Sequence, residues 1–129
     1  MNAFSKTYLI EQPLEKVYTY WISNSTLIPP VIKIEIEPWV GGFYRLILVG
    51  DAVMEGTFSQ VSNNKALSYS WQWQGDDEIT QVDVLFHVHE AGTEVQIKHG
   101  EFSSEQSLHQ HAQGWDNYIK GFRYFLQSQ

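Results

Sequence analysis

The stretch FSSEQSLHQHAQGWDNYIKGFRYFL, residues 102–126, decides the fold. Apolar and aromatic residues recur in it at the spacing of one helical face, and polar residues occupy most of the opposite face. The apolar face comprises Leu108, His111, Ala112, Trp115, Tyr118, Ile119, Phe122 and Leu126. Ser103 and Gln106 stand three apart, as in a capping box, and predict where the helix begins. A helix this one-sided needs a large apolar surface to lie on.

The chain before this helix is predicted to form mainly β-strands, because apolar and polar residues alternate along it. The strands are expected at residues 7–10, 32–36, 44–48, 54–61, 67–73, 81–88 and 95–99. In the strand at 44–48 both faces are apolar, so its inward phase stays open. Short connections between successive strands indicate an antiparallel meander.

A helical region is predicted after the first strand. Pro13 suits a first helical turn, and a helical stripe follows it. The stripe consists of Leu14, Val17, Tyr18, Trp21 and Ile22. We therefore expect one α+β domain over residues 1–129, in which a curved antiparallel sheet of about six to seven strands wraps around the C-terminal helix. A short helical pair would follow the first strand.

Composition excludes several classes of partner. A net charge of -7 disfavours binding to nucleic acid or to anionic membranes. The chain has no cysteine, which is compatible with a reducing compartment, and its N-terminus lacks the pattern of a secretory leader. We therefore expect a soluble cytoplasmic protein. Five Trp, seven Tyr and seven Phe are unusually many and suit a core, a ligand pocket or an interface.

A set of ordered features gives the chain a family resemblance. These are Gly41-Gly42, residues 67–71, Gly92-Thr93 with His99, and the sequence HAQGW at residues 111–115. With this order of elements, the chain from Thr7 to Leu126 resembles the family of homologues of the heat-shock ATPase activator, within the START-related, birch-pollen-allergen-like superfamily (SRPBCC). The resemblance implies a helix-grip fold with a cavity between sheet and terminal helix, which relatives use for apolar molecules. Eukaryotic members act as co-chaperones of the ninety-kilodalton heat-shock protein.

Inward strand positions and the helical stripe define the candidate ligand-binding residues. They are Tyr69, Trp71, Trp73, Val84, Phe86, Ile97, His99, Trp115, Tyr118, Ile119 and Phe122. A domain of this size also needs many such side chains simply to fill its core. The sequence leaves a ligand cavity and a solid core as alternatives, and the resemblance favours the cavity.

His99 interrupts the apolar inner face of the last strand. It could hydrogen-bond a ligand, or it could be a core histidine paired with Tyr69, Tyr118 or backbone carbonyls. For His111, one turn before Trp115, a packing or capping role is favoured. His87 and His89 should point outward, so no metal site is predicted.

Gly114 and Gly121 lie on the same side of the last helix and should each admit something close, either packed backbone or a cavity mouth. The consecutive carboxylates Asp76, Asp77 and Glu78 are expected to form a solvated loop rather than an acid/base pair.

Three functions stay open. The first is a binding domain that holds an apolar or amphipathic small molecule, with His99 and a tyrosine orienting it. The second is a protein-interaction module or a chaperone cofactor. The third is an enzyme with His99 as a cavity acid or base, although no catalytic motif is evident and no cofactor is implied. Exposed strand edges make a homodimer a further expectation.

Overall fold

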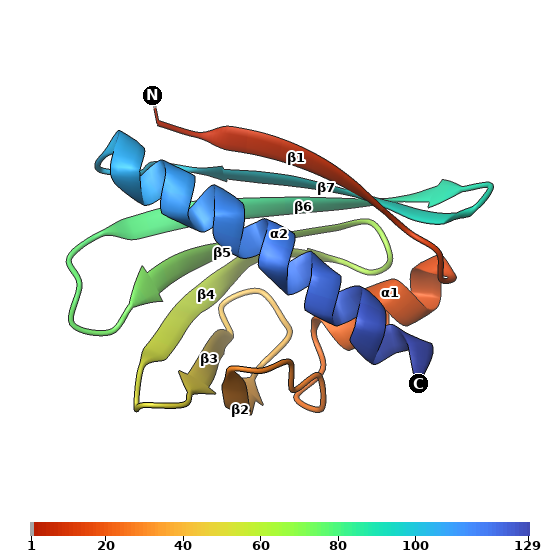
Figure 1. The fold of residues 1–129 in the computed structure, drawn as a ribbon, viewed down its shortest axis with the longest axis horizontal. Coiled ribbons are helices and arrows are strands. Elements are labelled where there is room, and N and C mark those ends of the chain that lie inside the picture. The colour runs from red at the N-terminus through yellow and green to blue at the C-terminus, as the bar shows by residue number, and fades with distance from the viewer. Residues whose placement is uncertain (1) are drawn as a thin grey trace.

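A seven-stranded sheet and two helices make up the computed structural model, which describes residues 2–129 (Figure 1). In chain order the elements are β1 (Phe4–Ile10), α1 (Leu14–Trp21), β2 (Val31–Ile36), β3 (Phe43–Leu48), β4 (Val53–Ser62), β5 (Ala66–Trp73), β6 (Ile79–His89), β7 (Gly92–Gly100) and α2 (Glu105–Gln127). Within these residues neither helix is long and apolar enough to cross a membrane.

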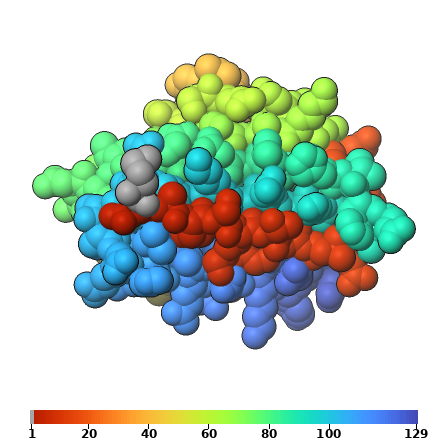
Figure 2. All heavy atoms as spheres, turned by 90° about the horizontal axis from the view of Figure 1, so that it is seen from above, coloured from red at the N-terminus to blue at the C-terminus, as the bar shows by residue number. Residues whose placement is uncertain are grey.

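The strands form an antiparallel meander that β1 completes. Their order in the sheet is β1-β7-β6-β5-β4-β3-β2, and every neighbouring pair is antiparallel. The long helix α2 runs diagonally across one face of the curved sheet (Figure 1). In the view from above, β1 lies across the surface with α2 on one side and the rest of the sheet on the other (Figure 2). The predicted α+β architecture is confirmed.

The predicted helical pair is wrong, because only α1 follows β1. After Trp21 the chain turns, and the Thr26 hydroxyl donates to the Tyr20 carbonyl at 2.6 Å, which ties the loop back to the end of the helix. Pro29 and Pro30 follow in this loop, and neither has an N–H to donate to a second helix. The connection therefore reaches β2 without another helical turn.

The start of α2 also differs by one residue from the predicted capping box. Ser104 is the N-cap, and its side chain accepts a hydrogen bond from the Ser107 N–H at 3.1 Å. Ser103 instead donates its backbone N–H and its hydroxyl to Glu78, at 2.7 and 2.6 Å. Glu78 is thus not simply part of a solvated loop. It directly precedes β6, and its hydrogen bonds attach the beginning of α2 to the start of that strand.

Strand β2 contains a register shift between Val31 and Lys33, which the alternation of its sequence does not reveal. The shift removes Ile32 from the inner face, where Ile34 and Ile36 remain, and leaves it 57% exposed. The alternation of Ile32, Ile34 and Ile36 with charged residues predicts all three isoleucines on one apolar face, and for Ile32 this prediction is wrong.

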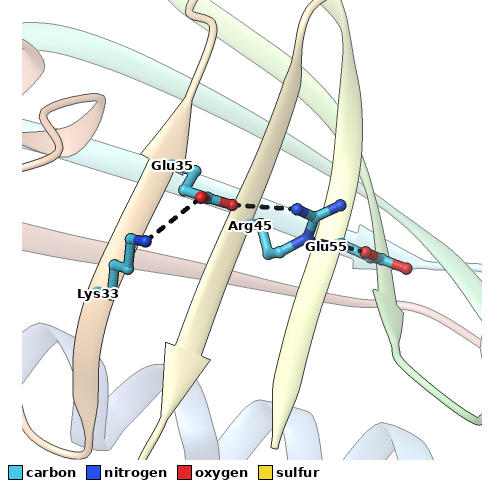
Figure 3. Close-up of polar contacts among 4 residues, drawn as sticks. All are labelled: Lys33, Glu35, Arg45 and Glu55. Atoms are coloured by element: carbon cyan, nitrogen blue, oxygen red, sulfur yellow. Dashed lines mark hydrogen bonds and ion pairs between the residues drawn. The ribbon is translucent and has the colours of Figure 1, made fainter.

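The outer face of β2, β3 and β4 carries a row of charges (Figure 3). Glu35 lies 3.6 Å from Lys33 and 3.0 Å from Arg45, and Arg45 lies 3.4 Å from Glu55. Exposed ion pairs contribute little stability individually. They decide which way the strands face, because the charged side must stay in water. The other side of the same strands is left for apolar contacts.

The core lies between α2 and the half of the sheet that contains β6 and β7. Trp115, Ile119, Phe122 and Leu126 are the buried residues of α2. They belong to one apolar cluster with the inward side chains of β6 and β7, which are Val82, Val84, Phe86, Val95 and Ile97. Helix α1 closes the end of this cluster, where Tyr18 meets Phe86 edge-on at 5.2 Å between ring centroids.

Replacing Phe122 tests this face of α2. Phe122 is fully buried, so Phe122→Ala should lower the free energy of unfolding in urea by about 3–5 kcal/mol through lost burial and the cavity left behind. Tyr124, which is 78% exposed on the same helix, is the matched control, and Tyr124→Ala should change stability by no more than about 0.5 kcal/mol. Equal losses for the two variants would contradict the assigned face.

Candidate functional site

A cavity of about 540 Å³ lies between α2 and the other half of the sheet. Pockets of about 300–1,000 Å³ accommodate small organic ligands. The sheet contributes side chains of β2 to β5, namely Val31, Ile34, Ile36, Tyr44, Leu46, Leu48, Met54, Phe58, Tyr69, Trp71 and Trp73. Helix α2 contributes Gln110, His111, Gly114, Trp115, Asn117 and Tyr118. The end of α1 and the loop after it supply Trp21, Ile22, Ser23, Thr26, Ile28, Pro29 and Pro30.

The cavity wall is mainly aliphatic and aromatic. Within residues 2–129, none of the residues that line it is a lysine, an arginine, an aspartate or a glutamate. Its polar groups are hydroxyls, indole N–H groups, two amides and the imidazole of His111. Such a surface binds through apolar contact and a few hydrogen bonds.

Polar contacts hold α2 on the β1 side of the sheet. Asp116 accepts hydrogen bonds from Lys6 at 2.9 Å and from the Tyr8 hydroxyl at 2.7 Å, both on β1. Further along the helix, the Arg123 guanidinium donates to the Leu9 carbonyl at 2.7 Å. These contacts place α2 beside the β1 edge, as Figure 2 shows, and the cavity opens over the distant strands β2 to β4.

The structure divides the predicted ligand-binding residues into two groups. Tyr69, Trp71, Trp73, Trp115 and Tyr118 line the cavity. The others are buried in the core and are not part of its wall; they are Val84, Phe86, Ile97, His99, Ile119 and Phe122. Alternation in a strand identifies the inner face, but it does not say which part of that face the helix covers.

His99 is a core histidine that lies behind the cavity wall. Its ring is fully buried between aromatic side chains, with Phe102 at 4.6 Å and Trp71 at 5.2 Å between ring centroids. Its Nδ1 accepts a hydrogen bond from the Trp115 indole N–H at 3.0 Å, and its Nε2 lies 2.7 Å from the Thr80 hydroxyl oxygen. The partners are therefore Trp115 and Thr80 rather than Tyr69, Tyr118 or a carbonyl.

These bonds fix the protonation state of His99. An indole N–H only donates, so Nδ1 carries no proton and the neutral ring has its proton on Nε2. Nε2–H then donates to Thr80, whose hydroxyl donates to the Trp71 carbonyl at 3.2 Å. Burial, helped by the nearby His111, lowers the pKa of His99 from 6.5 to about 3. With both nitrogens engaged, His99 is poorly placed to act as a cavity acid or base.

His111 does line the cavity, and local bonds also hold it. Its Nδ1 donates to the Ser107 carbonyl at 2.7 Å, and its Nε2 accepts from the Trp73 indole N–H at 3.4 Å. The Ser107 hydroxyl in turn donates to Glu78 at 2.6 Å. Although burial would raise the pKa of Glu78, hydrogen bonds from Ser103 and Ser107 bring it below its usual value. The favoured packing role of His111 is compatible with these contacts.

Three tyrosines from different elements contribute hydroxyl groups around the cavity. Tyr44 on β3 donates to the Ser70 carbonyl. Tyr69 on β5 accepts from the Trp21 indole N–H at 3.4 Å, and for Tyr118 on α2 no hydroxyl hydrogen bond is formed within residues 2–129. Burial raises the pKa of all three, and for Tyr44 and Tyr118 the neighbouring Tyr69 adds to the effect, so the hydroxyls stay protonated.

The sequence pattern does not reveal the part of the wall formed by β2, β3 and β4. Tyr44, Leu46 and Leu48 share one side of β3, but the apolar residues on its other side hid the inward phase. On α2, Gly114 was a usable signal, since it lines the cavity and a Cβ there would meet nothing within 4 Å. Gly121 differs, because a Cβ would lie 2.6 Å from the Ile28 Cγ2 atom, so its role is close packing.

His87 and His89 are exposed on β6, as predicted. Within residues 2–129 no group of three or more histidine, aspartate or glutamate side chains could hold a metal ion.

A sheet that grips a long C-terminal helix over an internal cavity defines the helix-grip class of domains. Residues 11–127 match the family described as "Activator of Hsp90 ATPase homolog 1-like protein", and the chain belongs to that family. A search of curated proteins found no match.

Solved structures share the fold at low sequence identity. Protein MLL2253 from Mesorhizobium loti is 18% identical with a TM-score of 0.87, and the alignment covers 98% of this chain and 97% of that one. An AHSA1-like protein from Aeromonas hydrophila is 21% identical with a TM-score of 0.78, over 98% and 92% of the two chains. CalU16 from Micromonospora echinospora is 20% identical with a TM-score of 0.74, over 96% and 74%.

The neutral state of His99 should make stability depend on pH. Its folded pKa, about 3, lies below the unfolded value of 6.5, so its contribution is complete above pH 6.5 and is lost as pH falls toward 3. We expect the free energy of unfolding, measured in urea, to fall by about 2 kcal/mol between pH 6.5 and 4.5. Carboxylates such as Glu78, whose pKa is lowered, lose their contribution to stability mainly below that window.

The control is His99→Gln, which cannot take up a proton at this position. Its stability should be lower at neutral pH but should change much less between pH 6.5 and 4.5. Parallel curves for the two proteins would show that His99 is not the group responsible.

Proposed function

We propose that this domain binds an apolar or amphipathic small molecule in the cavity between α2 and strands β2 to β5. The observation that carries the proposal is a cavity of about 540 Å³ with a mainly apolar wall. Protein interiors are packed about as densely as organic crystals, and voids much larger than a water molecule are few. A space of this size and lining is therefore better explained by a guest than by imperfect packing.

The cavity also has a route of entry along α2. Gln110, Gly114 and Asn117 both line the cavity and are exposed on the helix surface. They lie three and four residues apart, so they form one stripe on one side of the helix. Glycine at the centre of this stripe leaves the passage without a side chain, at a cost of about 1 kcal/mol in helix stability relative to alanine.

Closing the passage at Gly114 should weaken binding without unfolding the protein. We expect the neutral fluorescent probe N-phenyl-1-naphthylamine to bind wild-type protein with a rise in probe emission and to quench the tryptophans of the wall. Gly114→Phe should place a ring in the cavity mouth and weaken this binding by at least about tenfold, because the ring and the probe compete for the same volume.

Gln113→Phe is the matched control, since Gln113 is exposed on α2 and does not line the cavity. It adds the same ring to the same helix and should leave probe affinity within about twofold. The proposal fails if the native protein does not bind the probe, or if the two variants bind it equally well.

A second candidate function is that of a chaperone cofactor. It is favoured by the family's description and by two apolar side chains in the connection between β2 and β3, Trp39 and Val40, which are 58% and 63% exposed. Exposed aromatic side chains of this kind are common anchors of protein interfaces.

The chaperone-cofactor role can be tested separately from ligand binding. The purified domain should raise the ATPase rate of a ninety-kilodalton heat-shock protein, and Trp39→Ser should remove the stimulation while leaving probe binding in the cavity intact. An ATPase rate that does not respond to the domain would exclude this role for that chaperone.

A further inference from the structure

The side chains of the cavity wall indicate which kind of apolar or amphipathic molecule would bind there. Resting on the proposed function, we propose that the cavity selects an uncharged ligand that carries an acceptor oxygen, such as a ketone, ester or amide carbonyl, and that the hydroxyls of Tyr69 and Tyr118 donate to that oxygen.

The exclusion of charged ligands follows from the composition of the wall. None of its residues within the described chain is a lysine or an arginine, so a carboxylate would have no opposite charge to meet. None is an aspartate or a glutamate, so an ammonium group would be equally unpaired. Burying an unpaired charge costs far more than burying a neutral polar group with a hydrogen-bond partner.

The two donors are identified by accounting for the tyrosine hydroxyl protons. The Tyr44 hydroxyl already donates, to the Ser70 carbonyl. The Tyr69 hydroxyl accepts from Trp21, and no acceptor for its own proton is present within residues 2–129. Tyr118 forms no hydroxyl hydrogen bond to any described residue, although it lines the cavity. Two hydroxyl protons of the wall are therefore available to a guest.

Tyr69 and Tyr118 both contact Trp21 and therefore lie in the same part of the cavity. Its indole nitrogen lies 3.4 Å from the Tyr69 hydroxyl oxygen, and its ring meets that of Tyr118 edge-on at 5.7 Å between centroids. Burial, which raises the pKa of both tyrosines, keeps them as neutral donors. A phenol that stays protonated donates to a carbonyl oxygen but does not compensate a positive charge.

The opposite end of the guest would meet a different surface. Ile34 of β2 pairs with Leu46 of β3, and both line the cavity without a polar atom in their side chains. In the order of the sheet, β3 lies two positions and β2 three positions from β5, which holds Tyr69. The wall therefore has an aliphatic side at Ile34 and Leu46 and a hydrogen-bonding side at Tyr69 and Tyr118, which suits a molecule with a single polar end.

Three naphthalenes of nearly equal size test the inference by displacement of N-phenyl-1-naphthylamine at pH 7.5. They are 2-acetylnaphthalene with a carbonyl, 2-isopropylnaphthalene with no acceptor, and 2-naphthoate with a negative charge. The ketone should bind at least about tenfold more tightly than the carboxylate, because the carboxylate must lose its hydration without gaining a cation.

Tyr118→Phe then removes one hydroxyl and leaves no protein group without its partner. It should weaken binding of the ketone by about two- to tenfold, the range expected for one hydrogen bond, and should leave the affinity of the hydrocarbon unchanged. Tyr124→Phe, at an exposed position of the same helix, should affect neither compound.

Each other outcome has a distinct meaning. Equal or tighter binding of 2-naphthoate overturns the selection for uncharged ligands. A Tyr118→Phe variant that treats the ketone and the hydrocarbon alike overturns the hydrogen bond to Tyr118. If the wild type binds neither neutral naphthalene nor the fluorescent probe, the proposed function itself fails, and this inference fails with it.

Discussion

The hydrogen bond from the Trp115 indole to Nδ1 of His99 determines where α2 lies on the sheet. It joins the middle of the helix to β7 at 3.0 Å inside the core, where an unpaired polar atom would be costly. The next residue, Asp116, bonds to Lys6 and Tyr8 on β1, the strand adjacent to β7. Asp116 is half-exposed, so its ion pair contributes less than the buried bond. Together the two contacts hold the helix over the β1–β7 side of the sheet.

A helix that lies to one side of a wide sheet cannot cover the whole of it. The buried stripe of α2 fills the space over β6 and β7, where valine and isoleucine side chains meet it. The same helix contacts β5 through the hydrogen bond between Trp73 and His111 but leaves space over β2 to β4, and the cavity lies there with Gly114 in its wall. The outer faces of β2, β3 and β4 carry the ion pairs of Glu35, Arg45 and Glu55, which keep this side of the sheet in water while the inner faces line the pocket.

Much of this arrangement could be predicted from residues whose pattern depends on local structure. The helical stripe around Trp115 and the alternation of Tyr69, Trp71 and Trp73 correctly gave one face of α2 and the inner face of β5. The role of His99 could not be predicted, because its partners Thr80 and Trp115 lie on other elements and only tertiary contact reveals them. The exposure of Ile32 follows from a register shift that leaves no mark in the alternation. The cytoplasmic location and the homodimer stay predictions.

We propose above that a small molecule binds in the space between α2 and strands β2 to β5. The most direct measurement is an isotope-filtered nuclear Overhauser spectrum of labelled protein mixed with unlabelled 2-acetylnaphthalene. We expect contacts from the naphthalene protons to the methyl groups of Ile34, Leu46 and Met54, which face the cavity from three different strands. Contacts confined to exposed methyl groups such as those of Val49 or Val88, with none to the cavity wall, would contradict it.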